Sequence, residues 1–143
     1  MRELYIMRWP RDLTAVYVKG ATIRYEQEQS VYYANEVLTP GQIICTWSSM
    51  TNYLSSGCSP SLPLLKTGKT YELRIKLKAD NVLPVQIQIN FLDGERVVLA
   101  SYRGTDPSLA FRVPEGTVSY DVHLVNLKHQ WLRFEFLTIG EVG

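Results

Sequence analysis

The sequence is poor in the residues that most often bind metals. It has two histidines, His123 and His129, and two cysteines, Cys45 and Cys58, which lack the spacing of a C-x-x-C motif. The acidic residues do not cluster as an EF-hand loop requires. A buried calcium ion held by scattered side chains and carbonyl oxygens stays open as an alternative. The composition therefore predicts no cofactor and no clustered metal site.

Catalytic motifs are missing as well. The sequence contains no G-x-S-x-G nucleophile motif. The Gly-Lys-Thr at positions 68–70 lacks the upstream glycine and the following helix of a phosphate-binding loop. Asp121 and His123 share the outer face of a predicted strand, a geometry that fits a supporting catalytic pair but equally fits any solvated strand. We therefore do not expect an enzyme.

The chain also has little net charge and no long hydrophobic run. A formal net charge of +1 excludes the broad basic field typical of nucleic-acid binding. No apolar window approaches the roughly 20 residues that span a bilayer. Glu3, Arg8 and Arg11 interrupt the N-terminal segment, so no signal peptide is expected. These features predict one domain, residues 1–143, in the cytoplasm, with both cysteines reduced.

What the sequence does contain is alternation between apolar and polar residues. Tyr71, Leu73, Ile75 and Leu77 alternate with charged residues, which is typical of a strand with one wet face. Turn residues separate roughly ten such segments. The expected strands cover residues 4–9, 14–18, 21–26, 31–35, 42–47, 70–79, 85–92, 96–102, 109–113, 118–124 and 131–136. The pattern predicts an all-β fold, for which we favour a jelly-roll β-sandwich.

A long connection, Ser48 to Leu65, interrupts this pattern. Connections of this length in a compact domain are usually functional or disordered. Apolar residues in the connection, among them Leu62, Leu64 and Leu65, favour an ordered loop packed on the sandwich.

Aromatic residues supply the candidate binding sites. The chain has nine tyrosines and three tryptophans, and flat rings beside amides and hydroxyls suit both a sugar ring and a protein partner. Tyr32 and Tyr33 are consecutive, so one of them faces outward. The alternative is structural, with Trp47 and Tyr53 anchoring the long loop to the sandwich. The candidate partner-binding or glycan-binding residues are Trp47, Asn52, Tyr53, Trp131 and Tyr33.

Several segments together resemble a known family. They are Arg8-Trp9-Pro10, the run from Tyr17 to Tyr25, the run from Thr39 to Tyr53, and the run from Ser61 to Leu73. These segments resemble the third of the accessory secretory proteins of the accessory Sec system. Gram-positive cocci use that system to export serine-rich-repeat glycoprotein adhesins. The ending, Tyr120 to Val142, is similar to carbohydrate-binding modules.

The resemblance implies a cytoplasmic, non-catalytic β-sandwich that resembles a carbohydrate-binding module. It implies partners in the other two accessory secretory proteins, the glycosylated adhesin and the accessory translocation ATPase, with the complex peripheral to the membrane. It carries over no catalytic residue. A stand-alone glycan-binding module is the second hypothesis, and a small carbohydrate-active enzyme is the third.

Overall fold

The fold is taken from a computed structural model that describes residues 2–10, 16–27, 30–49, 62–81, 84–128 and 130–142. Ten strands form in these residues. They are β1 (Arg2–Met7), β2 (Ala21–Tyr25), β3 (Val31–Asn35), β4 (Ile43–Ser48), β5 (Thr70–Ala79), β6 (Val85–Leu92), β7 (Val98–Gly104), β8 (Ser108–Arg112), β9 (Ser119–Asn126) and β10 (Trp131–Glu141). These strands lie within about two residues of the predicted bounds, except that β10 runs on to Glu141. Of the predicted strand at 14–18, residues 16–18 are described, and Val16 forms a bridge with Cys45.

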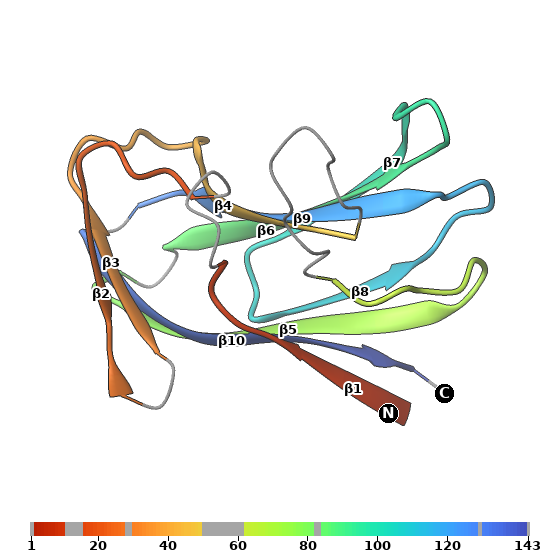
Figure 1. The fold of residues 1–143 in the computed structure, drawn as a ribbon, viewed down its shortest axis with the longest axis horizontal. Helices are drawn as coiled ribbons and strands as arrows, with labels where there is room; N and C mark the ends of the chain where they lie inside the picture. The colour runs from red at the N-terminus through yellow and green to blue at the C-terminus, as the bar shows by residue number, and fades with distance from the viewer. Residues whose placement is uncertain are drawn as a thin grey trace.

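The strands form two antiparallel sheets stacked face to face (Figure 1). The six-stranded sheet has the order β2-β3-β10-β5-β8, and β1 also pairs with β10. The four-stranded sheet has the order β4-β9-β6-β7. The predicted β-sandwich is therefore confirmed. Because sequence neighbours such as β4 and β5 lie in different sheets, the chain crosses repeatedly between the layers, as in a jelly roll.

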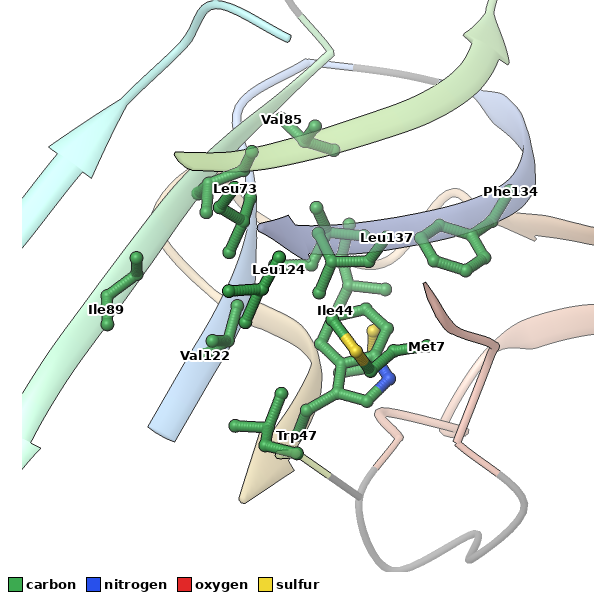
Figure 2. Close-up of a cluster of buried hydrophobic side chains, with 14 of the residues drawn as sticks. Met7, Ile44, Trp47, Leu73, Val85, Ile89, Val122, Leu124, Phe134 and Leu137 are labelled. Atoms are coloured by element: carbon green, nitrogen blue, oxygen red, sulfur yellow. The ribbon is translucent and has the colours of Figure 1, made fainter. Parts of the chain in front are cut away.

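The core fills the space between the two sheets. Each strand turns alternate side chains inward, so β6 contributes Val85, Ile87, Ile89 and Phe91 from one layer. Leu73, Phe134 and Leu137 contribute from the other layer, as Figure 2 shows for part of the cluster. The sandwich is held together mainly by this apolar burial, at roughly 25 cal/mol per Å² of buried apolar surface.

A bulge divides β10 into two halves with different neighbours. Residues 131–134 pair with β3, whereas residues 137–141 pair with β1, and the register to β5 shifts between Phe134 and Phe136. The extra residue reverses the alternation. The sequence pattern predicts Leu132, Phe134 and Phe136 on one face, and this is wrong for Phe136. Its ring lies on the outer face, and Leu137 takes the next inward position.

The long connection can be followed only at its ends, because residues 50–61 lie outside the described residues. At the C-terminal end, Leu62 is buried and its N–H donates to the carbonyl of Ser48, 3.2 Å away. Leu65 packs on the core as expected, but Leu64 is 86% exposed. In the part of the chain that the structure describes, no helix is long and apolar enough to cross a bilayer.

Cys45 is a free thiol buried in β4, and Cys58 lies outside the described residues. Burial raises the pKa of the Cys45 thiol well above its ordinary value, so it stays protonated and behaves as a small apolar core residue.

Candidate functional site

Four neighbouring strands of the six-stranded sheet place one residue each in a single transverse line. Arg24 of β2 lies opposite Tyr32 of β3, Tyr32 lies opposite Arg133 of β10, and Arg133 lies opposite Lys78 of β5. All four side chains point away from the core, because they alternate with inward residues such as Tyr33 and Phe134. We call Arg24, Tyr32, Arg133 and Lys78 the basic–aromatic row.

The rings and cations of the row contact one another. The Arg24 guanidinium lies 4.2 Å from the centroid of the Tyr32 ring, and the Arg133 guanidinium lies 5.5 Å from the same centroid. Trp131 stacks on Tyr32 with an interplanar angle of 15° and a centroid distance of 6.3 Å. Arg133 also lies 5.3 Å from the Trp131 ring. These cation–π and stacking contacts restrain the side chains of the row in one arrangement.

The row carries more positive than negative charge. Arg133 donates from Nε to Oε1 of Glu26 at a distance of 3.1 Å, so that cation is compensated. Among the described residues, no carboxylate lies within ion-pair distance of Arg24 or Lys78. The two ends of the row are therefore positive, and its centre is aromatic.

A second cluster extends the same face beyond the bulge. The partly buried ring of Phe136 lies 5.7 Å from the Arg8 guanidinium and 5.8 Å from the Lys76 ammonium. Lys76 also pairs with Glu135 at 3.6 Å, and Nη1 of Arg8 donates to the main-chain carbonyl of Glu135 at 3.1 Å. Rings flanked by Lys or Arg thus occur on both sides of the bulge.

The outer face of the four-stranded sheet has a different character. A hydrogen bond of 2.8 Å joins Oγ1 of Thr46 to Nδ1 of His123. Oδ1 of Asn90 accepts from Oγ of Ser101 at 2.7 Å. Burial lowers the pKa of His123 below its ordinary value, while the Asp121 carboxylate acts in the opposite direction. Among the residues that the structure describes, no group of three or more His, Cys, Asp or Glu could hold a metal ion. This face offers hydroxyls and amides, a set of groups that suits hydrogen-bonding ligands.

Trp47 does not lie on the surface. The sequence pattern places it at the end of the expected strand 42–47 and its ring is a predicted binding candidate, but it is the penultimate residue of β4 and only 1% exposed. Its ring lies 5.5 Å from that of Phe134, and its Nε1 donates to the carbonyl of Arg8 at 2.8 Å. Trp47 is therefore a core residue, which leaves no exposed ring at this position for a partner or a sugar.

Tyr33 is also a core residue, so the outward member of the tyrosine pair is Tyr32. Tyr33 is fully buried, and its hydroxyl donates to the carbonyl of Tyr17 at 2.8 Å and accepts from Nδ2 of Asn35 at 3.1 Å. The sequence holds a signal for the inward position of Tyr33. Tyr33 lies two residues after Val31, so both side chains point to the same side of the strand, and the apolar Val31 marks that side as the one that faces the core.

Trp131 is the candidate that the structure places on the surface, beside the basic–aromatic row. Asn52 and Tyr53 lie outside the described residues and stay predictions. Arg24 and Arg133 are not among the residues predicted from the sequence, because only the pairing of β2, β3 and β10 brings these arginines to one ring.

Comparison with known proteins identifies relatives along nearly the whole chain. Residues 16–141 match the family described as "Accessory Sec secretory system ASP3". The chain is 30% identical over 142 residues to the ASP3 protein of the accessory Sec system of Streptococcus gordonii, and the match covers 99% of this chain and 88% of that protein.

Two solved structures agree with that result. One is a crystal structure of accessory secretory protein 1, 2 and 3 in Streptococcus pneumoniae; the match has a TM-score of 0.90 and 28% identity, and covers 96% of this chain and 95% of the matched chain. The other is the Gap123 complex of Streptococcus agalactiae, with a TM-score of 0.88 and 26% identity over 98% of this chain and 45% of that chain.

A weaker likeness concerns the fold alone. A structure described as "CBM4 structure and function" matches with a TM-score of 0.51 and 15% identity over 99% of this chain and 88% of that chain. The sandwich is therefore of the kind found in carbohydrate-binding modules, as the family resemblance implied.

Proposed function

This chain belongs to the ASP3 family of the accessory Sec secretory system, and from that premise we propose that it is a non-catalytic interaction subunit. In this proposal residues 1–143 act as one unit that binds the other two accessory secretory proteins. The complex engages the glycosylated serine-rich-repeat adhesin in the cytoplasm and presents it to the accessory translocation ATPase at the membrane. The Streptococcus pneumoniae structure, which is named for accessory secretory proteins 1, 2 and 3 together, supports the choice of partners.

The observation that carries the proposal is the basic–aromatic row with Trp131 beside it. Arg, Tyr and Trp are the residues enriched at the energetic centres of protein interfaces. Here the Tyr32 ring lies between two guanidinium groups, so little side-chain entropy remains to be lost on binding. The uncompensated charges of Arg24 and Lys78 favour an acidic partner surface and would speed its association.

The test is co-purification of the tagged chain with the other two accessory secretory proteins of the same bacterium. We expect Arg24→Glu and Trp131→Ala each to lower the recovered partner about tenfold, as loss of an interface hot spot does. Arg103→Glu is the matched control, because Arg103 is an exposed arginine on the outer face of the four-stranded sheet. Equal recovery with all three variants would refute this face as the partner surface.

Glycan binding is the second candidate function. The hydroxyl and amide groups around Thr46, His123 and Asn90 favour it, together with the fold shared with carbohydrate-binding modules. If it is correct, titration with glycosylated serine peptides should give saturable binding that Asn90→Ala and His123→Ala weaken. Binding that both variants leave unchanged would exclude this face.

A further inference from the structure

One side of the sandwich is open beside Ser108, where β8 begins. The inward residues of β5 are buried at Tyr71 and Leu73 but only partly buried at Ile75, Leu77 and Ala79. The cause is the length of β8, which pairs with β5 from Thr70 to Arg74 and no further. Figure 1 shows β8 beside only part of the longer β5. The last half of β5 therefore presents inner-face side chains next to an uncovered sheet edge.

A cavity of about 230 Å³ lies at this opening. Its floor is apolar and comes from both sheets, with Ile75, Leu77 and Ala79 on β5 and Val85 and Ile87 on β6. The other lining residues are Asn81, Pro84, Thr105, Asp106 and Pro107, three of which are polar. Such a cavity suits aliphatic side chains that enter from the side of the sandwich.

The backbone of β5 at this edge lacks a neighbouring strand in the part of the chain that the structure describes. The N–H of Ile75 points to this edge, where it donates to the carbonyl of Pro107 at 2.9 Å. Because hydrogen-bonding direction alternates along a strand, the N–H and C=O of Leu77 and Ala79 point to the same edge. Within the described ranges, no strand pairs with these two residues on that side. They can therefore accept one more strand.

The charged side chains beside the open edge of β5 favour particular residues in the strand that could be added there. Lys76 and Lys78 alternate with the cavity residues and point to the outer face, and Lys78 is the terminal cation of the basic–aromatic row. Lys76 already pairs with Glu135, whereas Lys78 has no carboxylate within ion-pair distance among the described residues. Asp106 lines the cavity at the end of the opening where β8 begins.

From these observations we infer that the open edge of β5 binds an extended segment of a protein partner in which acidic and aliphatic residues alternate. The segment pairs with Leu77 and Ala79 by strand addition. Its aliphatic side chains enter the cavity, and its carboxylates lie beside Lys76 and Lys78. The inference deepens the proposed function, since it rests on the partner being a protein.

The test uses the full ¹⁵N-labelled chain and a synthetic seven-residue peptide of alternating Glu and Val. We expect saturable shifts at the amides of residues 75–79, slower exchange of the Leu77 and Ala79 N–H groups, and a submillimolar Kd, roughly that of a short added strand. The same peptide with Lys in place of Glu should bind about tenfold more weakly. No shift at residues 75–79 up to about 2 mM peptide, or equal binding of both peptides, would overturn the inference.

Two variants and one control separate binding from folding. Ala79→Phe fills the cavity from within and should weaken the Glu–Val peptide about tenfold, and Lys78→Glu should weaken it severalfold. Ala110→Phe is the control, because Ala110 lies exposed on β8, away from the cavity, and should leave binding unchanged. Unchanged binding by Ala79→Phe would overturn the inference. The proposed function is judged separately, by co-purification of Arg24→Glu, so a failure here does not refute it.

Discussion

Trp47 donates its indole N–H to the main-chain carbonyl of Arg8, 2.8 Å away. The bond joins β4 of the four-stranded sheet to the segment that follows β1 of the six-stranded sheet. Since the Trp47 ring also packs on Phe134, one side chain links both layers of the sandwich and the N-terminal segment. Trp47, which directly precedes the long connection from Ser48 to Leu65, is therefore part of the scaffold.

Trp47→Phe should destabilise the fold without touching the partner surface. The change removes a buried hydrogen bond and leaves space beside Phe134, so we expect a loss of about 2–3 kcal/mol in the free energy of unfolding. Urea denaturation measures this loss. Trp131→Phe is the control and should stay within about 0.5 kcal/mol, because that ring is on the outer face. Equal losses for the two variants would contradict the assignment of Trp47 to the core.

Tyr32 and Tyr33 should also differ in how much the free energy of unfolding falls when each is changed to phenylalanine, which removes only the hydroxyl. The Tyr33 hydroxyl has two hydrogen-bond partners, the carbonyl of Tyr17 and the amide of Asn35. We expect Tyr33→Phe to cost about 1–2 kcal/mol of unfolding free energy, and Tyr32→Phe less than about 0.5 kcal/mol. Thermal denaturation of both variants under one condition tests this. A larger cost at Tyr32 would mean that the phase of β3 is reversed.

His123 should make the stability of the fold fall in mild acid. Burial lowers the pKa of folded His123 below the value of about 6.5 expected for the unfolded chain. Between those two values the unfolded state binds more protons, so stability is fully present above about pH 6.5 and is lost as the pH falls toward the folded pKa.

The measurement is urea denaturation from about pH 7.5 to about pH 5, with His123→Gln as the reference. The difference in unfolding free energy between wild type and His123→Gln should shrink as the pH falls through this window. His129 is present in both proteins, so its titration cancels. A difference that is constant with pH would show that His123 titrates normally.

Gly20 and Gly41 offer a matched pair for backbone strain. Both have left-handed φ angles, +76° for Gly20 and +92° for Gly41, where an alanine costs about 1–2 kcal/mol. A Cβ on Gly20 would also lie 2.8 Å from Cγ2 of Val37, whereas one on Gly41 would meet nothing within 4 Å. We therefore expect Gly20→Ala to lower the melting temperature more than Gly41→Ala. The reverse order would be inconsistent with the packing of Gly20 against Val37.

The fold was predictable because most strands alternate cleanly between turns. The alternation of β5 and β6 gives both ends of each strand correctly, and Asp93-Gly94 marks the hairpin that follows β6. Each of these signals is local, since it lies within one strand or one turn. The two-layered architecture follows from them without knowledge of which strands pair.

The candidate site was much less predictable, because it depends on pairing between distant strands. Arg24, Tyr32 and Arg133 meet only through the registers of β2 with β3 and of β3 with β10, and nothing local encodes a contact across about a hundred residues. Bulges add to the difficulty. The register shift between Ile43 and Cys45 in β4, like the one in β10, changes which residues face inward.

The bulge in β10 can be tested with two phenylalanines that lie two residues apart. A regular strand would bury both, but Phe134 is fully buried whereas Phe136 lies on the outer face near Arg8 and Lys76. We expect Phe134→Ala to cost about 3–5 kcal/mol, the usual loss for a core phenylalanine, and Phe136→Ala to cost about 1 kcal/mol or less. Urea denaturation gives both values. Leu137→Ala is the third measurement and should cost about 2–5 kcal/mol, because the bulge turns that residue inward. A regular strand would give the opposite result, with a large loss at Phe136 and a small one at Leu137.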